Sequence, residues 1–262
     1  MKKLRIDLHN HTYLCNHASG TMQEYIQKAI EFGIDVFGFS CHAPMNFDPK
    51  YRMSFEDMII YENEIFRLQE EFKDKIKILF AYEVDFLEGF IDDKVINKDV
   101  DYFIGSVHFI DKWGFDNPEF IGRYDDMDID DIWQKYFDAI SLMAKSGLFD
   151  IVGHLDLIKV FKFMPKKKIS DIAYDTLKEI QRSKMTIEVN PAGIRKPIGE
   201  VYPSPEILKI ANSLNIPITF GSDAHHIDQI GFGYEEALKA TKVAGYKQAR
   251  YFVKKEPIII DI

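Results

Sequence analysis

Seven short runs of apolar, mostly β-branched residues recur along this chain, with helical patterns between them. Such runs are typical of buried β-strands, and strands that alternate with helices indicate a parallel sheet with right-handed crossovers. The seven runs are Leu4–Leu8, Val36–Ser40, Ile76–Tyr82, Tyr102–Val107, Ile151–Gly153, Met185–Val189 and Ile216–Gly221. This alternation restricts the chain to an α/β fold, and we predict a single barrel of about seven βα units.

The segments between the runs place apolar residues three or four positions apart, which is the helical period. The expected helices are Met22–Phe32, Ile59–Phe72, Ile132–Gly147, Ile169–Ser183 and Pro205–Leu214. Gly33 is a natural stop for the first helix, and Pro205 opens the last one. We expect long loops at Asn46–Met53 and Asp111–Asp131. No glycine–serine linker and no internal repeat divides the sequence, so we predict one domain over residues 1–262.

Composition excludes several classes of protein. The 262 residues are 46% hydrophobic and 29% charged, which suits a globular protein with a sizeable core. The net charge of -9 argues against a nucleic-acid surface, although bound metal ions could still attract a phosphorylated substrate. The presence of only two cysteines argues against a disulfide framework. The start of the chain lacks the features of a signal peptide, and no apolar stretch is long enough to span a membrane, so we predict a cytoplasmic protein.

Histidines and carboxylates follow these apolar runs with unusual regularity. Seven of the eight histidines lie at or just beyond the end of a run. Function gathers at the carboxyl ends of strands in parallel barrels, and imidazole is the commonest metal ligand in proteins. The candidate ligands are His9, His11, His17, His42, Glu83, His108, His154, Asp223 and His225. Nine ligands from six segments are too many for one ion, so we predict a polynuclear metal site at the mouth of the barrel.

The sequence leaves open the roles of several polar residues that lie next to the candidate ligands. A carboxylate at a strand end can bridge two cations, and we prefer Glu83 for this role over Asp85, which points to the same side of the strand. Glu188 is either an acceptor that orients a ligand histidine or the partner of a buried cation. We expect the side chain of His226 to point away from its neighbour His225 and to lie at the surface or behind the ligands.

Other catalytic motifs do not fit the sequence. Neither Cys15 nor Cys41 is followed by the arginine of a cysteine phosphatase. The segment Asp126–Asp130 lacks the calcium-loop glycine and does not follow an apolar run. Gly231-Phe-Gly233 lacks the third glycine of a dinucleotide loop, and no Gly-x-Ser-x-Gly elbow occurs. Of the catalytic chemistries considered, only the metal-dependent one fits the sequence.

The ligand motifs together resemble those of the PHP (polymerase and histidinol phosphatase) family over essentially the whole chain. The motifs are Asp7-Leu-His9-Asn-His11-Thr, His17, Ser40-Cys-His42, Glu83-Val-Asp85, Ser106-Val-His108, Gly153-His154 and Gly221-Ser-Asp223-Ala-His225. The resemblance implies a distorted (β/α)7 barrel with a trinuclear metal site. It is greatest to the stand-alone histidinol-phosphatase branch, because nucleotide-directed members commonly carry an aspartate where this chain has His17.

The resemblance also implies a division of the ligands among three divalent ions, which could be zinc, iron or manganese. One ion would be bound by His9, His11, Glu83 and Asp223. A second would share Glu83 and add His108 and His154, and a third would be bound by His17, His42 and His225. The implied substrate is L-histidinol phosphate, an intermediate of histidine biosynthesis. The sequence leaves the oligomeric state open.

The ligand cluster predicts hydrolysis of a phosphomonoester by attack of a metal-bound hydroxide on phosphorus, with Glu83 and Asp223 as the catalytic carboxylates. Arg195 follows the sixth run and is the preferred phosphate-binding residue, since a guanidinium offers paired donors; Lys159 is the second choice. The alternatives are a PHP-type nucleotide phosphatase or nuclease, a C–N bond hydrolase of amidohydrolase type, and a non-catalytic metal-binding module.

Overall fold

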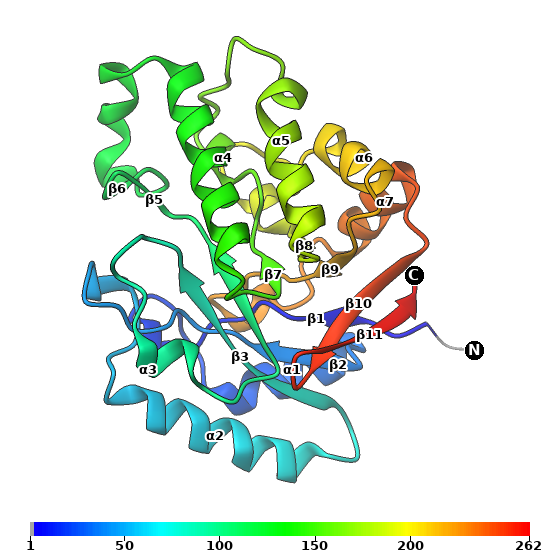
Figure 1. Ribbon diagram of the computed structural model, residues 1–262. Helices are drawn as coiled ribbons and strands as arrows, with labels where there is room; N and C mark the ends of the chain where they lie inside the picture. Colours follow the sequence, from blue (N-terminus) through cyan, green and yellow to red (C-terminus); the bar gives the residue numbers. More distant parts are fainter. Residues whose placement is uncertain (1–2) are drawn as a thin grey trace.

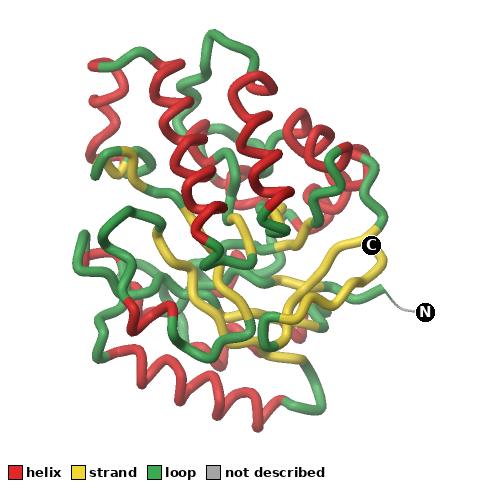
Figure 2. The backbone as a smooth tube through the Cα atoms, in the orientation of Figure 1, coloured by secondary structure: helices red, strands yellow, loops and turns green. Residues whose placement is uncertain are grey.

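A seven-stranded parallel sheet lies at the centre of the computed structural model, which describes residues 3–262 (Figures 1 and 2). The strands follow one another in the sheet in chain order. They are β1 (Ile6–Asp7), β2 (Val36–Phe39), β3 (Lys77–Asp85), β4 (Tyr102–Ser106), β7 (Ile151–Val152), β8 (Thr186–Val189) and β9 (Ile218–Phe220). Each strand lies within or overlaps one of the seven apolar runs. The predicted α/β barrel is therefore confirmed.

Backbone hydrogen bonds bring the two outer strands of the sheet together and nearly close the barrel. The amide of Leu8 donates to the carbonyl of Phe220 at 2.8 Å. Beyond the strands, Asp223 N donates to His9 O at 2.7 Å, and His11 N donates to Ala224 O at 2.9 Å. The first and last ligand motifs of the sequence thus become neighbours because the sheet curls.

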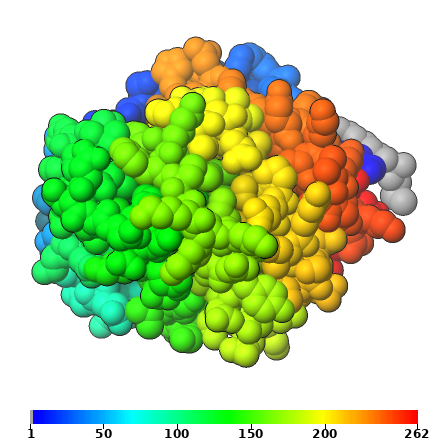
Figure 3. Space-filling view, turned by 90° about the horizontal axis from the view of Figure 1, so that it is seen from above, coloured from blue at the N-terminus to red at the C-terminus, as the bar shows by residue number. Residues whose placement is uncertain are grey.

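Helices cover the outside of the sheet. They are α1 (Met22–Phe32), α2 (Asp57–Phe72), α3 (Asp93–Ile96), α4 (Ile129–Ser146), α5 (Ile169–Arg182), α6 (Pro205–Ser213) and α7 (Tyr234–Ala244). In Figure 1, α2 and α3 lie below the strands, and α4, α5 and α6 lie above them. Figure 3 shows that later parts of the chain follow one another across the upper face, from green to orange. Each helix lies beside the strands that it connects, which is the expected βα arrangement.

Local signals in the sequence set the ends of α1. The hydroxyl of Thr21 accepts from Glu24 N at 3.2 Å, and the Glu24 carboxylate accepts from Thr21 N at 2.7 Å. This reciprocal capping satisfies two amides that the helix leaves free. Gly33 ends α1 with φ at +81°, a conformation that glycine adopts without steric cost. The predicted stop at Gly33 is confirmed.

A tyrosine crosses the interior of the barrel below the site. The Tyr102 hydroxyl, from β4, donates to the carbonyl of Leu8 at 2.6 Å. A Cβ atom at Gly38, on β2, would lie 1.8 Å from that hydroxyl oxygen. Glycine at this position therefore leaves the space through which Tyr102 reaches β1, and the contact fixes the strand that carries the first ligands.

The segment Asp111–Asp131 is not the long irregular loop that the sequence predicted. It contains β6 (Trp113–Gly114), which pairs with β5 (Phe109–Ile110), and a 3-10 helix over Pro118–Asp126. Helix α4 also begins at Ile129 rather than Ile132, because the Asp128 side chain accepts from Asp130 N at 2.8 Å. Asp128, which was expected to lie in a loop, instead caps a helix. The other expected loop, Asn46–Met53, contains only a short 3-10 turn.

The hairpin of β10 (Gln248–Val253) and β11 (Glu256–Asp261) was not predicted, and neither were α3 and α7. The hairpin turns at Lys254 and Lys255, whose φ values are +49° and +69°. Glycine or asparagine usually occupies such positions, so the sequence lacked the ordinary turn signal. Within residues 3–262 no helix combines the length and the apolar character that crossing a membrane requires.

Candidate metal centre

A cavity of about 750 Å³ opens where the loops after the parallel strands converge. Its wall includes Arg195 and most of the predicted ligands, namely His17, His42, Glu83, His108, His154, Asp223 and His225. His9 and His11 are fully buried and contact Glu83 and Asp223 of that wall. The structure therefore brings all nine predicted ligands to one end of the barrel.

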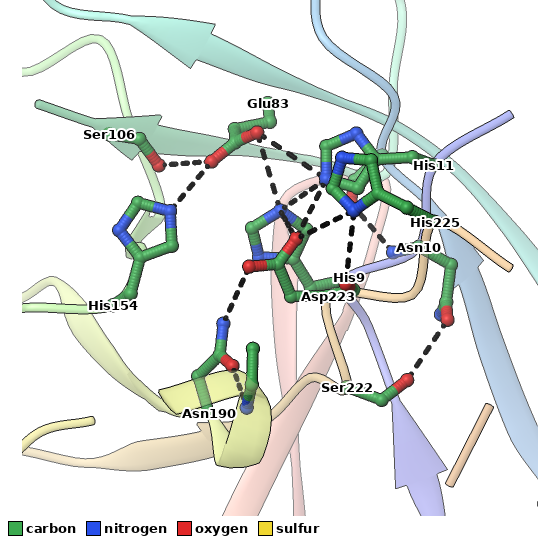
Figure 4. Close-up of polar contacts among 12 residues, drawn as sticks. His9, Asn10, His11, Glu83, Ser106, His154, Asn190, Ser222, Asp223 and His225 are labelled. Atoms are coloured by element: carbon green, nitrogen blue, oxygen red, sulfur yellow. Dashed lines mark hydrogen bonds and ion pairs between the residues drawn. The ribbon is translucent and has the colours of Figure 1, made fainter. Parts of the chain in front are cut away.

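Four ligand atoms converge between β1, β3 and β9. The Nε2 atoms of His9 and His11 are 3.1 Å apart, and His11 Nε2 lies 3.1 Å from Asp223 Oδ1. Glu83 Oε2 lies 3.4 Å from His9 Nε2 and 3.6 Å from His11 Nε2. Ligands bound tetrahedrally to zinc at about 2.0 Å are about 3.3 Å apart, so these atoms fit around one cation. Figure 4 shows the four side chains pointing toward a common centre.

The two carboxylate oxygens of Glu83 face different histidines. Oε1 lies 3.1 Å from His154 Nε2 and 3.8 Å from His108 Nε2. It also accepts a hydrogen bond of 2.6 Å from the Ser106 hydroxyl, which fixes the carboxylate (Figure 4). Oε2 lies between His9 and His11 and is also 2.8 Å from Nδ1 of His42. Glu83 therefore has the geometry of a bridge between two cations. We call these residues the inner group: His9, His11, Glu83, His108, His154 and Asp223.

Three further imidazoles form an outer group of His17, His42 and His225. The ring centroids of His17 and His225 are 4.6 Å apart, and those of His17 and His42 are 5.3 Å apart. Nδ1 of His17 lies 2.8 Å from the Cys15 carbonyl, and Nδ1 of His225 lies 3.2 Å from the Asp223 carbonyl. A ring that donates from Nδ1 keeps its Nε2 lone pair for a cation. His225 Nε2 is buried and finds no hydrogen-bond partner in the described part of the chain, as expected of a ligand atom.

Glu188 supports the inner group from behind. Its Oε1 lies 2.7 Å from His9 Nδ1, and its Oε2 accepts from the amide of His154 at 2.8 Å. A Cβ atom at Gly221 would lie 2.1 Å from that Oε1 and 2.4 Å from His9 Cβ, so glycine there allows the contact. Of the two roles left open for Glu188, the geometry favours the acceptor that orients a ligand histidine.

Asp85 supports His108 in the same way. Its Oδ1 makes a short contact with His108 Nδ1, and its Oδ2 accepts from Arg52 Nη1 at 2.7 Å. Both carboxylate oxygens are therefore engaged away from the point where the inner ligands converge. This arrangement favours Glu83 over Asp85 as the bridging carboxylate, and it gives Arg52 a role that the sequence did not predict.

The surroundings of the inner carboxylates favour their ionised form. Burial alone would raise the pKa of Glu83, but the imidazoles of His9 and His42 outweigh burial and hold this pKa well below its usual value. The pKa of Asp223 is likewise held well below its usual value, because His9 and His11 outweigh burial. Buried, ionised carboxylates among imidazoles are typical of a site that binds divalent cations.

The two predicted phosphate-binding residues lie in different environments. Arg195 lines the cavity, and its Nη2 donates to the carbonyls of Ser222 and Asp223 at 3.0 Å each. Its Nη1 is buried and has no hydrogen-bond partner among residues 3–262, so a donor remains for a ligand. Lys159 is fully buried away from the cavity wall, and its Nζ lies 2.9 Å from Asp156 and 2.7 Å from Glu200. The structure therefore does not bring Lys159 to the site.

Two cysteines lie beside the outer group, which sequence reasoning missed. Ligand atoms of Cys15, His17 and His225 lie within 4.8 Å of one another, as do those of His11, Cys15 and Cys41. Both cysteines are buried and free. Their positions next to His17 and His42 in the sequence were the available signal. His226 lies at the surface, where its Nδ1 accepts from Asp228 N at 3.2 Å.

Comparison with known proteins defines the class to which this fold and site belong. Residues 7–192 match the PHP domain and residues 205–243 match a PHP-associated region. The chain belongs to the PHP family, which confirms the resemblance seen in the ligand motifs. The extent of the domain, residues 1–262, stays a prediction.

Three individual proteins are similar to this chain over most of their length. A protein of Deinococcus radiodurans named "Probable histidinol-phosphatase" is 37% identical over 244 residues, which cover 91% of this chain and 93% of that protein. The histidinol-phosphatase of Bacillus subtilis is 29% identical, covering 89% of this chain and 98% of that protein. The crystal structure of a histidinol phosphate phosphatase from Lactococcus lactis, complexed with zinc, L-histidinol and phosphate, superposes with a TM-score of 0.79. It is 22% identical and covers 97% of this chain and 98% of that chain.

Proposed function

We propose that this protein hydrolyses L-histidinol phosphate to L-histidinol and inorganic phosphate, as a histidinol-phosphatase of histidine biosynthesis in the cytoplasm. The observation that carries the proposal is the similarity to named histidinol-phosphatases over nine tenths of the chain, combined with a full set of nine ligands around one cavity. His17 supports the same branch of the family, since nucleotide-directed members commonly have an aspartate there.

We propose three divalent ions, of zinc, iron or manganese, as cofactors. The ligand spacing fits this number, because Glu83 presents one oxygen to His9 and His11 and the other to His108 and His154. The outer group offers a third set of nitrogens. Divalent ions bound there would lower the pKa of a water molecule and offset the charge of a phosphate group.

The residues of the chain would prepare the site for a phosphomonoester. Glu83 and Asp223 supply negative charge that fixes the cations, and Glu188 and Asp85 orient His9 and His108. Arg195 would donate to the phosphate from Nη1, while its contacts with two backbone carbonyls hold the guanidinium in place.

A metal-resolved phosphatase assay tests this function. Purified protein, loaded separately with zinc, iron or manganese, would be assayed with L-histidinol phosphate, AMP, 3′-phosphoadenosine 5′-phosphate, an aryl phosphate and a dipeptide. We expect L-histidinol phosphate to be hydrolysed far faster than the others, chelation to abolish activity, and elemental analysis to find more than two ions per chain. Equal or faster turnover of a nucleotide, or metal binding without turnover of any compound, would overturn the proposal.

The role of Arg195 has its own test. Arg195→Ala should lower kcat/KM by about 10–10³-fold with unchanged metal content, because a charge-assisted paired contact is lost. Arg195→Lys should restore only part of the activity, since an ammonium cannot reproduce paired donors. The matched control is Arg182→Ala, which removes an exposed arginine of α5. Unchanged kinetics and phosphate inhibition in Arg195→Ala would place phosphate recognition elsewhere.

A further inference from the structure

Among the described residues, five carboxylates line the cavity: Asp48, Glu83, Asp85, Asp116 and Asp223. Four of them already face a cationic group or an imidazole. Asp85 contacts Arg52 and His108, and Asp48 lies 4.0 Å from Arg52. Glu83 and Asp223 face the ligand histidines. Asp116 differs, because within residues 3–262 no lysine, arginine or histidine nitrogen forms an ion pair with it.

Asp116 follows the β5–β6 hairpin on a segment that precedes the 3-10 helix at Pro118–Asp126. Its side chain is half-buried at the wall of the cavity. Burial raises the pKa of Asp116, and the charges of His108 and His154 offset only part of that effect. A carboxylate taken partly out of water without a counter-ion is costly unless a bound ligand supplies one. Asp116 is therefore suited to a cationic group that the protein itself does not provide.

We propose that Asp116 binds the ammonium group of the substrate and so selects phosphate esters that carry an amine. This inference rests on the proposed function and adds a residue that determines specificity. In L-histidinol phosphate the ammonium is on the carbon next to the methylene that bears the phosphoester. An ester placed at the inner group, beside His108 and His154, would thus present its ammonium a few bonds away.

The neighbouring wall suits the remainder of the substrate. Phe47 and Phe109 both line the cavity, and their ring centroids are 5.1 Å apart. Phe109 belongs to β5 of the hairpin that precedes Asp116. Aromatic rings offer an apolar surface against which a flat heterocycle can pack. The cavity therefore combines inner-group ligands, a free carboxylate and an aromatic wall, which match the phosphate, ammonium and ring of the substrate.

The test compares two substrates that differ by one group. L-Histidinol phosphate carries the amine, and 3-(imidazol-4-yl)propyl phosphate lacks it. The wild-type protein should prefer the amine by at least about tenfold in kcat/KM, as expected for a hydrogen bond between charged groups. Asp116→Asn should lower kcat/KM for L-histidinol phosphate by about 10–100-fold and leave the amine-free ester within about threefold of wild type. Metal content should not change.

Asp111→Asn is the matched control, because Asp111 lies on the same hairpin but is exposed and paired with Lys135. It should leave both substrates unaffected. Asp116→Ser provides a second variant if the first does not fold. Equal losses on both substrates would assign Asp116 to the metals or to proton transfer, and no loss would leave it without a role; either result overturns the inference. An equal kcat/KM of the wild-type protein for both esters would overturn the inference without any variant. Failure of the wild-type protein to hydrolyse either ester would instead refute the proposed function.

Discussion

The inner and outer groups of the metal centre differ in how firmly the protein holds them. In the inner group, the side chains of His9, His11, Glu83 and His154 are at most 3% exposed, and those of His108 and Asp223 are 13% and 17% exposed. In the outer group, His42 and His225 are 13% and 25% exposed, and His17 is an exposed residue. Carboxylates support the inner imidazoles, since Glu188 contacts His9 and Asp85 contacts His108. Neutral carbonyls support two of the outer imidazoles, at Cys15 for His17 and at Asp223 for His225. Nδ1 of the third, His42, lies 2.8 Å from Oε2 of Glu83.

This difference teaches that one cluster can contain sites of unequal affinity. A carboxylate behind an imidazole fixes the tautomer and increases the basicity of the ligand, and burial prevents water from competing. A carbonyl fixes the tautomer but contributes less charge. We therefore expect the inner group to bind its cations first and to lose them last.

Loss of the bridging carboxylate of Glu83 should lower activity more than any other change. Glu83→Ala should lower kcat by at least about 10³-fold, because one carboxylate faces both cation positions of the inner group. The measurement is steady-state kinetics with elemental analysis of the purified variant. His226→Ala is the control and should be nearly silent, since its side chain lies at the surface. Comparable losses in the two variants would show that the ligand set is misassigned.

Removal of the Glu188 charge, which contacts His9, should weaken metal binding at the inner group with a smaller effect than the loss of Glu83. Glu188→Gln keeps the size of the side chain but removes the negative charge that His9 Nδ1 contacts. We expect metal affinity of the inner group to fall by about 10–100-fold. A competition titration against a chromogenic chelator measures this change, with the exposed Glu206→Gln as control. An unchanged affinity would mean that the carboxylate only fills space.

Protons should compete with cations at the inner group more strongly than at the outer group. Burial would lower the pKa of His11 and His108, but contacts with Asp223 and Asp85 outweigh it and raise these values to about 9 and about 10. Burial lowers the pKa of His42 to about 4. Without metal at neutral pH, His11 and His108 thus carry protons that a cation must displace, whereas His42 is already neutral.

Inner-group affinity should therefore rise with pH up to about 9, by roughly tenfold per pH unit for each proton released, and fall as the pH drops toward 6. Binding at His42 should release no proton over that range, because His42 is already neutral. Calorimetric titration of the metal-free protein with zinc, in buffers of different ionisation enthalpy, counts the released protons. Equal proton release in every binding step would refute the contrast between the groups.

The smallest effect is expected for an outer ligand. His17→Ala should remove about one equivalent of metal and leave the inner cations in place, because His17 is exposed and lies next to His42 and His225 of the outer group. The fall in kcat should be smaller than that of Glu83→Ala. Elemental analysis of the two variants, prepared in parallel, provides the comparison. Loss of all metal in His17→Ala would show that the groups are not separable.

Patterns within single segments determined much of this protein. The apolar runs predicted all seven parallel strands, because buried strands need continuous apolar faces whatever surrounds them. The same reading predicted the end of α1 at Gly33, since backbone conformation at a helix end depends on one residue. It did not find the β10–β11 hairpin, because Lys254 and Lys255 form its turn and the packing beside β9 compensates for their poor turn propensity.

For the site, the sequence alone determined which side chains follow the strands, and tertiary structure decided what each one contacts. Lys159 and Arg195 were both plausible cations near strand ends, yet Lys159 is buried against Asp156 and Glu200 while Arg195 faces the cavity. Asp116 belongs to no motif and becomes notable only because it lies at the cavity wall after the hairpin, with no ion-pair partner among the described residues. Ion pairing and cavity exposure depend on residues distant in the chain, so the folded arrangement determines them and local sequence does not.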